Sequence, residues 1–142
     1  MLTWLDDLEE WARLIAQILR PGGLFFIREG HPMAMALDYE GPAGELTLAW
    51  PYFTTGPIMD DNADDYSSAE KLHHARTFEW AHSLGEILGV LLRQGLTILD
   101  FQEFKDLPWK LFDWMESNGH DYVLPEPLRD RCPLSFCVIA RR

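Results

Sequence analysis

Basic residues and long apolar runs are scarce in this sequence. Its 142 residues include 12 Lys and Arg against 23 Asp and Glu, for a formal net charge of −11. Because proteins that bind nucleic acids or anionic membranes gather Lys and Arg on one surface, this balance disfavours both partners. No apolar run is long enough to span a bilayer, and the N-terminal "MLTWLDDLEE" lacks the basic flank and apolar block of a signal peptide. We therefore expect a cytoplasmic protein.

Cysteine is also scarce. The chain has two cysteines, Cys132 and Cys137, and the second lies in the apolar run "LSFCVIA" (134–140). This pattern favours thiols buried in a core over a disulfide framework or a zinc site.

No metal site is predicted. His73 and His74 are adjacent, with no further ligand at a suitable spacing. The acidic run 60–65 begins like a calcium loop, but Asp65 stands where such a loop needs Gly and Lys71 where it needs a bidentate Glu.

The first third of the chain predicts a helix followed by a strand. Apolar residues recur at helical spacing, which predicts a helix from about Thr3 to Arg20 that the following Pro-Gly-Gly ends. The next run, "LFFIRE" (24–29), is almost continuously apolar. This is typical of a parallel strand that helices cover on both faces.

The remainder predicts a second helix and two further strands. Ser83 and Glu86 have the spacing of a capping box, and Gly95 ends the helix that they begin. Strands are expected at "LTILDFQEF" (96–104) and "PLSFCVIARR" (133–142), and the insert 30–81 contains a hairpin that turns at 41–44. The prediction is one α/β domain, 1–142: a partial Rossmann-like sheet of about three strands with flanking helices, plus an inserted β-hairpin cap.

Several polar and aromatic side chains are expected at one edge of this sheet. In an open α/β sheet the end of a strand and the start of the next helix share the edge at which ligands bind. That edge collects Thr3, Trp4, Glu29, His31, Trp80 and His82. Glu29 and His31 have the chemistry of a general base.

Structural roles compete with each of these assignments. Glu29 could instead hold the insert through backbone hydrogen bonds, and His31 could be a turn residue before Pro32. His82 could donate to a nearby carbonyl, and Trp80 could belong to the core. The insert aromatics, Trp50, Tyr52 and Phe53, either line an apolar pocket or form a small core of their own.

Four motifs together carry a family resemblance: "WLDDLEEWA" (4–12), "LRPGG" (19–23), "EGHP" (29–32) and "FEWAHSL" (78–84). In this order they resemble the C-terminal half of class I S-adenosylmethionine-dependent methyltransferases that act on small molecules. The resemblance implies S-adenosylmethionine as cofactor, near Thr3 and Trp4. It also implies a small-molecule methyl acceptor bound by Trp4, Tyr52, Trp80 and His82, with Glu29 or His31 as the base.

The family's cofactor-binding half has no counterpart in the sequence. That family holds its cofactor with a Gly-rich turn after the first strand and an acid at the end of the second, and neither is present. We therefore expect a chain that is inactive alone, and a homodimer that covers the open strand edge. The alternatives are a non-catalytic module, derived from such an enzyme, that binds a small molecule or a protein, and an unrelated α/β interaction domain.

Overall fold

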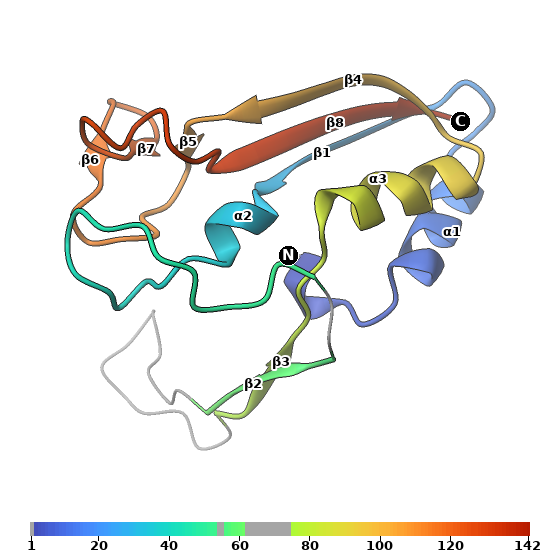
Figure 1. Cartoon of the computed structure of the whole chain (residues 1–142). Coiled ribbons are helices and arrows are strands. Elements are labelled where there is room, and N and C mark those ends of the chain that lie inside the picture. Colours follow the sequence, from blue (N-terminus) through green and yellow to red (C-terminus); the bar gives the residue numbers. More distant parts are fainter. Residues whose placement is uncertain (1, 54–55, 62–74) are drawn as a thin grey trace.

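A three-stranded sheet with helices on one face forms the body of the protein (Figure 1). The computed structural model describes residues 2–53, 56–61 and 75–142. The elements are the 3-10 turn η1 (Leu2–Trp4), α1 (Leu8–Ile18), β1 (Leu24–Gly30), α2 (Pro32–Met35), β2 (Ile58–Asp60), β3 (Thr77–Glu79), α3 (Leu84–Arg93), β4 (Thr97–Phe104), β5 (Asp106–Leu107), β6 (Glu116–Ser117), β7 (Tyr122–Val123) and β8 (Ser135–Arg141).

The main sheet has the order β1-β8-β4, and β8 is antiparallel to both neighbours. β1 and β4 therefore run in the same direction, so their C-terminal ends lie at the same edge of the sheet. The mixed α/β class with a small partial sheet is confirmed. The parallel pairing expected for 24–29 is not observed among the described residues, because the neighbour of β1 is the antiparallel β8.

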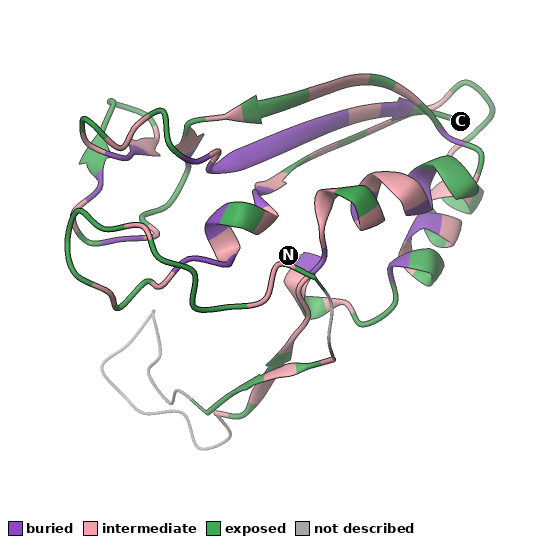
Figure 2. Cartoon of the chain, in the orientation of Figure 1, coloured by how far each residue is buried: buried purple, intermediate pink, exposed green. Residues whose placement is uncertain are grey.

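The core lies between this sheet and the helices α1 and α3. One face of β8 contributes Phe136, Val138 and Ala140, which are fully buried. Leu8 and Ala12 of α1 and Ile87, Val90 and Leu91 of α3 cover them. Figure 2 shows β8 as the most continuously buried strand of the sheet.

Burial of β1 on both faces was a wrong prediction. Phe25 and Ile27 pack against the core, whereas Leu24 and Phe26 are each 63% exposed on the opposite face. In the part of the chain that the structure describes, helices cover one face of this sheet. A continuous apolar run does not indicate whether its second face has a partner.

The helix boundaries follow the capping residues. α1 begins at Leu8 and not near Thr3, because Asp7 accepts a hydrogen bond from the Glu10 N–H (3.0 Å) and caps the helix. α3 begins where the sequence predicted: the Ser83 hydroxyl accepts from the Glu86 N–H (3.2 Å). No helix among the described residues is long and apolar enough to cross a bilayer.

The insert is built differently from the expectation. The predicted hairpin at 36–50 is reduced to one isolated bridge, between Leu37 and Leu48. The hairpin that forms instead pairs β2 with β3. A third small sheet, β5-β7-β6, was not predicted, because two-residue strands have no readable periodicity.

A second core cluster lies beside this small sheet and α2. It includes Ala34, Leu37, Leu107, Phe112, Leu124 and Cys132. Cys132 and Cys137 are buried free thiols, as predicted. Burial raises the pKa of Cys132 to about 11, which keeps this thiol protonated at neutral pH.

Replacing Phe136 tests which aromatic residues hold the sheet and helices together. Phe136→Ala should lower the free energy of unfolding by about 3–5 kcal/mol, because the ring is fully buried and the residual cavity cannot collapse completely. Phe53→Ala is the matched control, since that ring is 70% exposed and its loss should cost less than about 1 kcal/mol. Urea denaturation measures both. Equal losses would contradict the assignment of the core.

Candidate functional site

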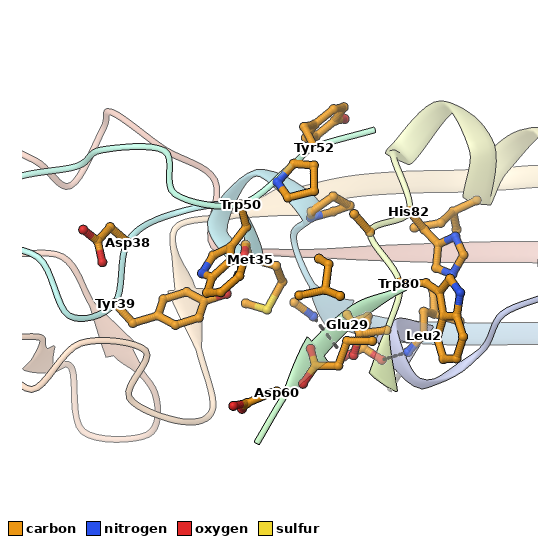
Figure 3. Close-up of a pocket in the computed structure, with 18 of the residues that line it drawn as sticks. Leu2, Glu29, Met35, Asp38, Tyr39, Trp50, Tyr52, Asp60, Trp80 and His82 are labelled. Carbon is orange, nitrogen blue, oxygen red and sulfur yellow. Dashed lines mark hydrogen bonds between the residues drawn. The ribbon is translucent and has the colours of Figure 1, made fainter. Parts of the chain in front are cut away.

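A cavity of about 790 Å³ lies beside the C-terminal end of β1. Its walls come from the β1–α2 turn, the loop 38–52, the β2–β3 hairpin and the start of η1, with the entry to α3 at one end (Figure 3). Small-molecule sites typically have volumes of several hundred Å³, so the cavity has the size of a metabolite site.

Aromatic side chains from separate segments line the cavity. Trp50 and Tyr52 come from the loop, Trp80 follows β3, and Trp109 follows β5. Tyr39 lies opposite the hairpin, and its hydroxyl donates to the Met35 carbonyl. Trp50 and Trp109 are 44% and 42% exposed, so part of each ring is open to a ligand.

The β2–β3 pairing directs acidic side chains into the same cavity. Ile58 pairs with Glu79, and Asp60 pairs with Thr77. Because side chains alternate along a strand, Ile58, Asp60 and Glu79 share the face that lines the cavity. Met59 and Phe78, on the other face of the hairpin, are 64% and 44% exposed.

These acidic and phenolic groups influence one another. Burial raises the pKa of Glu79, and the nearby Asp60 carboxylate raises it further. Burial, with the charge of Glu79 as a second cause, raises the pKa of Tyr39 to about 12. Negative charge on this side of the cavity therefore opposes further negative charge.

Glu29 lines the cavity and also holds the chain around it. Its Oε1 accepts from the Gly30 N–H (3.1 Å) and its Oε2 from the Leu2 N–H (3.4 Å), as the dashed lines in Figure 3 show. The carboxylate thus ties η1 to the end of β1. The structural interpretation of Glu29 holds, and the side chain also faces the cavity.

His31 does not share this cavity, contrary to the expectation that it would face Glu29. The side chain is 4% exposed, and its Nδ1 accepts from the Met33 N–H (3.0 Å), which caps α2. Since Nδ1 accepts, the proton lies on Nε2, which donates to Glu103 Oε1 at 2.9 Å. Burial lowers the pKa of His31, and Glu103 offsets part of that effect. A helical turn that starts at Pro32 needs such a cap. Because the His31 side chain forms the cap, it points away from the cavity.

Tyr52, Trp80 and His82 line the cavity. The Tyr52 hydroxyl accepts from the Leu84 N–H at the start of α3 (3.4 Å). The backbone N–H of Trp80 donates to the Thr3 carbonyl (2.8 Å), which ties the chain after β3 to η1.

His82 is 5% exposed, and its Nε2 lies 2.7 Å from the Leu5 carbonyl oxygen, the contact expected of a structural histidine. Its Nδ1 lies 3.4 Å from Glu86 Oε2, but this contact lacks hydrogen-bond geometry, and the atom has no hydrogen-bond partner among the described residues. His82 therefore presents a buried, unused nitrogen next to the cavity wall.

Of the two residues expected to contact S-adenosylmethionine, one lines the cavity. Thr3 is among the lining residues, whereas Trp4 is 54% exposed and lies outside the lining.

Sequence reasoning missed Tyr39, Asp60, Glu79 and Trp109. The pairing of β2 with β3 places Asp60 and Glu79, and the short β5 places Trp109. A polar–apolar alternation at 77–79 is a local signal for β3, but no local pattern indicates its register with β2 or the two-residue strand β5.

Among the described residues, no three His, Cys, Asp or Glu side chains lie close enough together to hold a metal ion. His73, His74 and positions 62–65 of the acidic run lie outside the described residues.

Comparison with solved structures identifies the fold. The chain superposes on an S-adenosylmethionine-dependent methyltransferase from Mesorhizobium loti with a TM-score of 0.59 and 22% identity, over 99% of this chain and 57% of that one. A Listeria monocytogenes protein provisionally named as the same kind of enzyme gives a TM-score of 0.59 and 14% identity, over 100% of this chain and 57% of its own. No protein-family model and no curated protein sequence matches the chain. The fold is thus that of part of a class I methyltransferase, and the chain spans 57% of the length of these structures.

The state of His31 can be tested by NMR titration of its imidazole. Because burial disfavours the charged ring, its pKa should lie below 6.5, and Glu103→Gln should lower it further by removing the carboxylate that favours the imidazolium. A pKa for His31 at or above 6.5 would contradict the assigned hydrogen bonds.

Proposed function

We propose that this chain is the acceptor-binding part of an S-adenosylmethionine-dependent methyltransferase-like protein, and that it binds a small molecule in the cavity at the end of β1. The observation that carries this proposal is the position of the cavity. It opens at the C-terminal edge of the sheet, where open α/β folds bind ligands, in a fold shared with methyltransferases.

We propose further that the chain is inactive alone. The solved structures that share its fold have a further part, with no counterpart here, since the chain spans 57% of each. We infer that the described residues hold no site for S-adenosylmethionine, which supplies a methyl group on a sulfonium when bound, because Trp4 lies outside the cavity lining. That site would have to come from another part of the protein or from another chain.

Within this proposal Glu29 is the group that faces the acceptor. Its carboxylate is already oriented by two backbone N–H groups, so it could accept a proton or a hydrogen bond without rearrangement. His31 acts as a positioning residue, because it fixes the turn that follows Gly30. Tyr52, Trp80 and His82 form the end of the cavity beside α3.

A homodimer is also proposed. Leu24, Phe26 and Leu99 are 63%, 63% and 46% exposed, and the two on β1 lie on the face of the sheet opposite the helices. In the described residues β1 pairs through one edge only. An apolar face beside an open strand edge favours association with a second copy, or with the remaining part of a larger protein. We also propose a cytoplasmic location.

The alternative function, a non-catalytic binding module, is favoured by one observation: Trp4, which the resemblance places next to the cofactor, is exposed outside the cavity lining. Both functions use the same cavity, and they differ in whether methyl transfer occurs once a donor site is supplied.

Calorimetry with S-adenosylmethionine tests whether the isolated chain binds the cofactor. The isolated chain should release no binding heat at micromolar ligand, since its sequence lacks the Gly-rich turn and the acid with which the family holds this cofactor. S-Adenosylhomocysteine, which lacks the sulfonium charge, is the control ligand. A micromolar dissociation constant for either would mean that this chain holds its own donor site.

Light scattering tests self-association. The chain should be dimeric at micromolar concentration, and Phe26→Lys should make it monomeric by placing a charge on the open apolar face. Met59→Lys is the matched control, because Met59 is 64% exposed but lies on the β2–β3 hairpin. A wild-type chain that stays monomeric at every concentration would remove the proposed dimer.

A further inference from the structure

We propose that the ligand of this cavity carries a planar aromatic ring, which binds against the unpaired indole rings of the cavity wall. This inference rests on the proposed function, in which the cavity holds the methyl acceptor, and it names the chemical class of that acceptor.

Three tryptophans from separate segments line the cavity. Trp50 belongs to the loop 38–52, Trp80 follows β3 and Trp109 follows β5. Trp50 and Trp109 are 44% and 42% exposed, although tryptophan is on average a highly buried residue. Both rings therefore leave apolar surface inside a concave space, which a bound ligand would cover.

These three indoles have no ring partner among the described residues. Aromatic side chains in the core contact one another: the ring centroids of Trp11 and Phe25 are 5.8 Å apart, and those of Phe112 and Trp114 are 4.7 Å apart. In the described part of the chain, no Lys or Arg side chain lies over any of the three indoles. The rings at the cavity can therefore pair with a ring of the ligand.

An unpaired indole does not by itself indicate a ligand. Trp4 also has no ring partner in the part that the structure describes, and it is 54% exposed outside the cavity lining. The observation that carries the inference is that three such rings, from three separate segments, line one cavity. Small-molecule sites are lined in this way, mostly by hydrophobic and aromatic side chains.

The cavity wall at the end of β1 also suits a flat ring. A Cβ atom at Gly30 would lie 3.0 Å from Met35 Cε and 3.4 Å from Trp109 Cζ2, so the methionine methyl and the edge of the indole both lie against the Gly30 backbone. Thioether groups make favourable contacts with aromatic rings. Met35 and Trp109 therefore offer an aromatic ligand two kinds of contact that a saturated ring uses less well.

Burial of apolar surface and pairing of rings favour different ligands. A saturated ring has a larger apolar surface than an aromatic ring with the same number of carbon atoms, so burial alone favours the saturated ring. Contacts between aromatic rings contribute beyond the buried area, which favours the aromatic ring. The order of the two affinities therefore shows whether the indoles recognise an aromatic ring.

Two probes that differ in this way test the inference on the isolated chain: 2-phenylethanol and 2-cyclohexylethanol. They share the hydroxyl, the spacer and the number of ring carbons, and both are uncharged near neutral pH. In NMR titrations 2-phenylethanol should bind at millimolar concentration, at least about 3-fold more tightly than 2-cyclohexylethanol.

Variants that remove a ring but keep an apolar side chain test whether the tryptophans cause the preference. Trp50→Leu combined with Trp109→Leu should largely remove the preference for 2-phenylethanol, whereas Trp50→Phe combined with Trp109→Phe should keep part of it. Phe78→Leu is the matched control, because it removes a ring with the same 44% exposure as Trp50 from the face of the hairpin that lies away from the cavity. It should leave both affinities unchanged.

The outcomes separate this inference from the proposed function. Equal or tighter binding of 2-cyclohexylethanol overturns the aromatic ligand but leaves an acceptor site in place. Failure of both probes to bind at millimolar concentration, or a preference that is undiminished in the paired Leu variant, also overturns the aromatic ligand. Micromolar binding of S-adenosylmethionine would instead overturn the proposed function, whatever the probes show.

Discussion

The cavity depends on the hydrogen bonds of one neutral histidine. The backbone N–H of His31 donates to the Leu134 carbonyl (2.9 Å). In the side chain, Nδ1 caps α2 and Nε2 contacts Glu103 of β4, while the ring packs edge-on against Phe136 of β8. These contacts fix the point at which the chain leaves β1, turns through α2 and continues into the loop that forms one cavity wall. A proton on Nδ1 would remove the acceptor that caps α2, so burial of a neutral ring and the shape of the site are linked.

The antiparallel insertion of β8 explains why the cavity and the open face occur in one small chain. β8 lies between β1 and β4 and is antiparallel to both. β1 and β4 therefore run in the same direction and end at the edge where the cavity lies. The helices that complete the crossover cover a single face of the sheet. The other face keeps exposed apolar side chains such as Phe26, which a further layer of protein would bury. The fold thus has two open surfaces. The uncovered face of the sheet suits a protein partner, and the cavity at the end of β1 suits a ligand.

Local signals predicted the elements, and long-range pairing placed the site. The Ser83–Glu86 spacing predicted the start of α3, since a cap involves residues three positions apart. The apolar run of β1 predicted a strand but not its exposed face, because that depends on which layers are present. Asp60 and Glu79 reach the cavity through the β2–β3 register, which no local pattern sets. The sequence placed Glu29 at the correct edge, and it could not show that the cap of α2 would turn His31 away.

The tryptophans provide the most direct test of a ligand site in this cavity. Three of the chain's six, Trp50, Trp80 and Trp109, line the cavity, and Trp4, Trp11 and Trp114 do not. In a ¹⁵N-labelled chain each indole N–H gives its own NMR signal, which can be followed during titration with 2-phenylethanol. The account predicts saturable shifts for the first three signals and none for the other three. Shifts that are equal across all six, or confined to the second set, would contradict it.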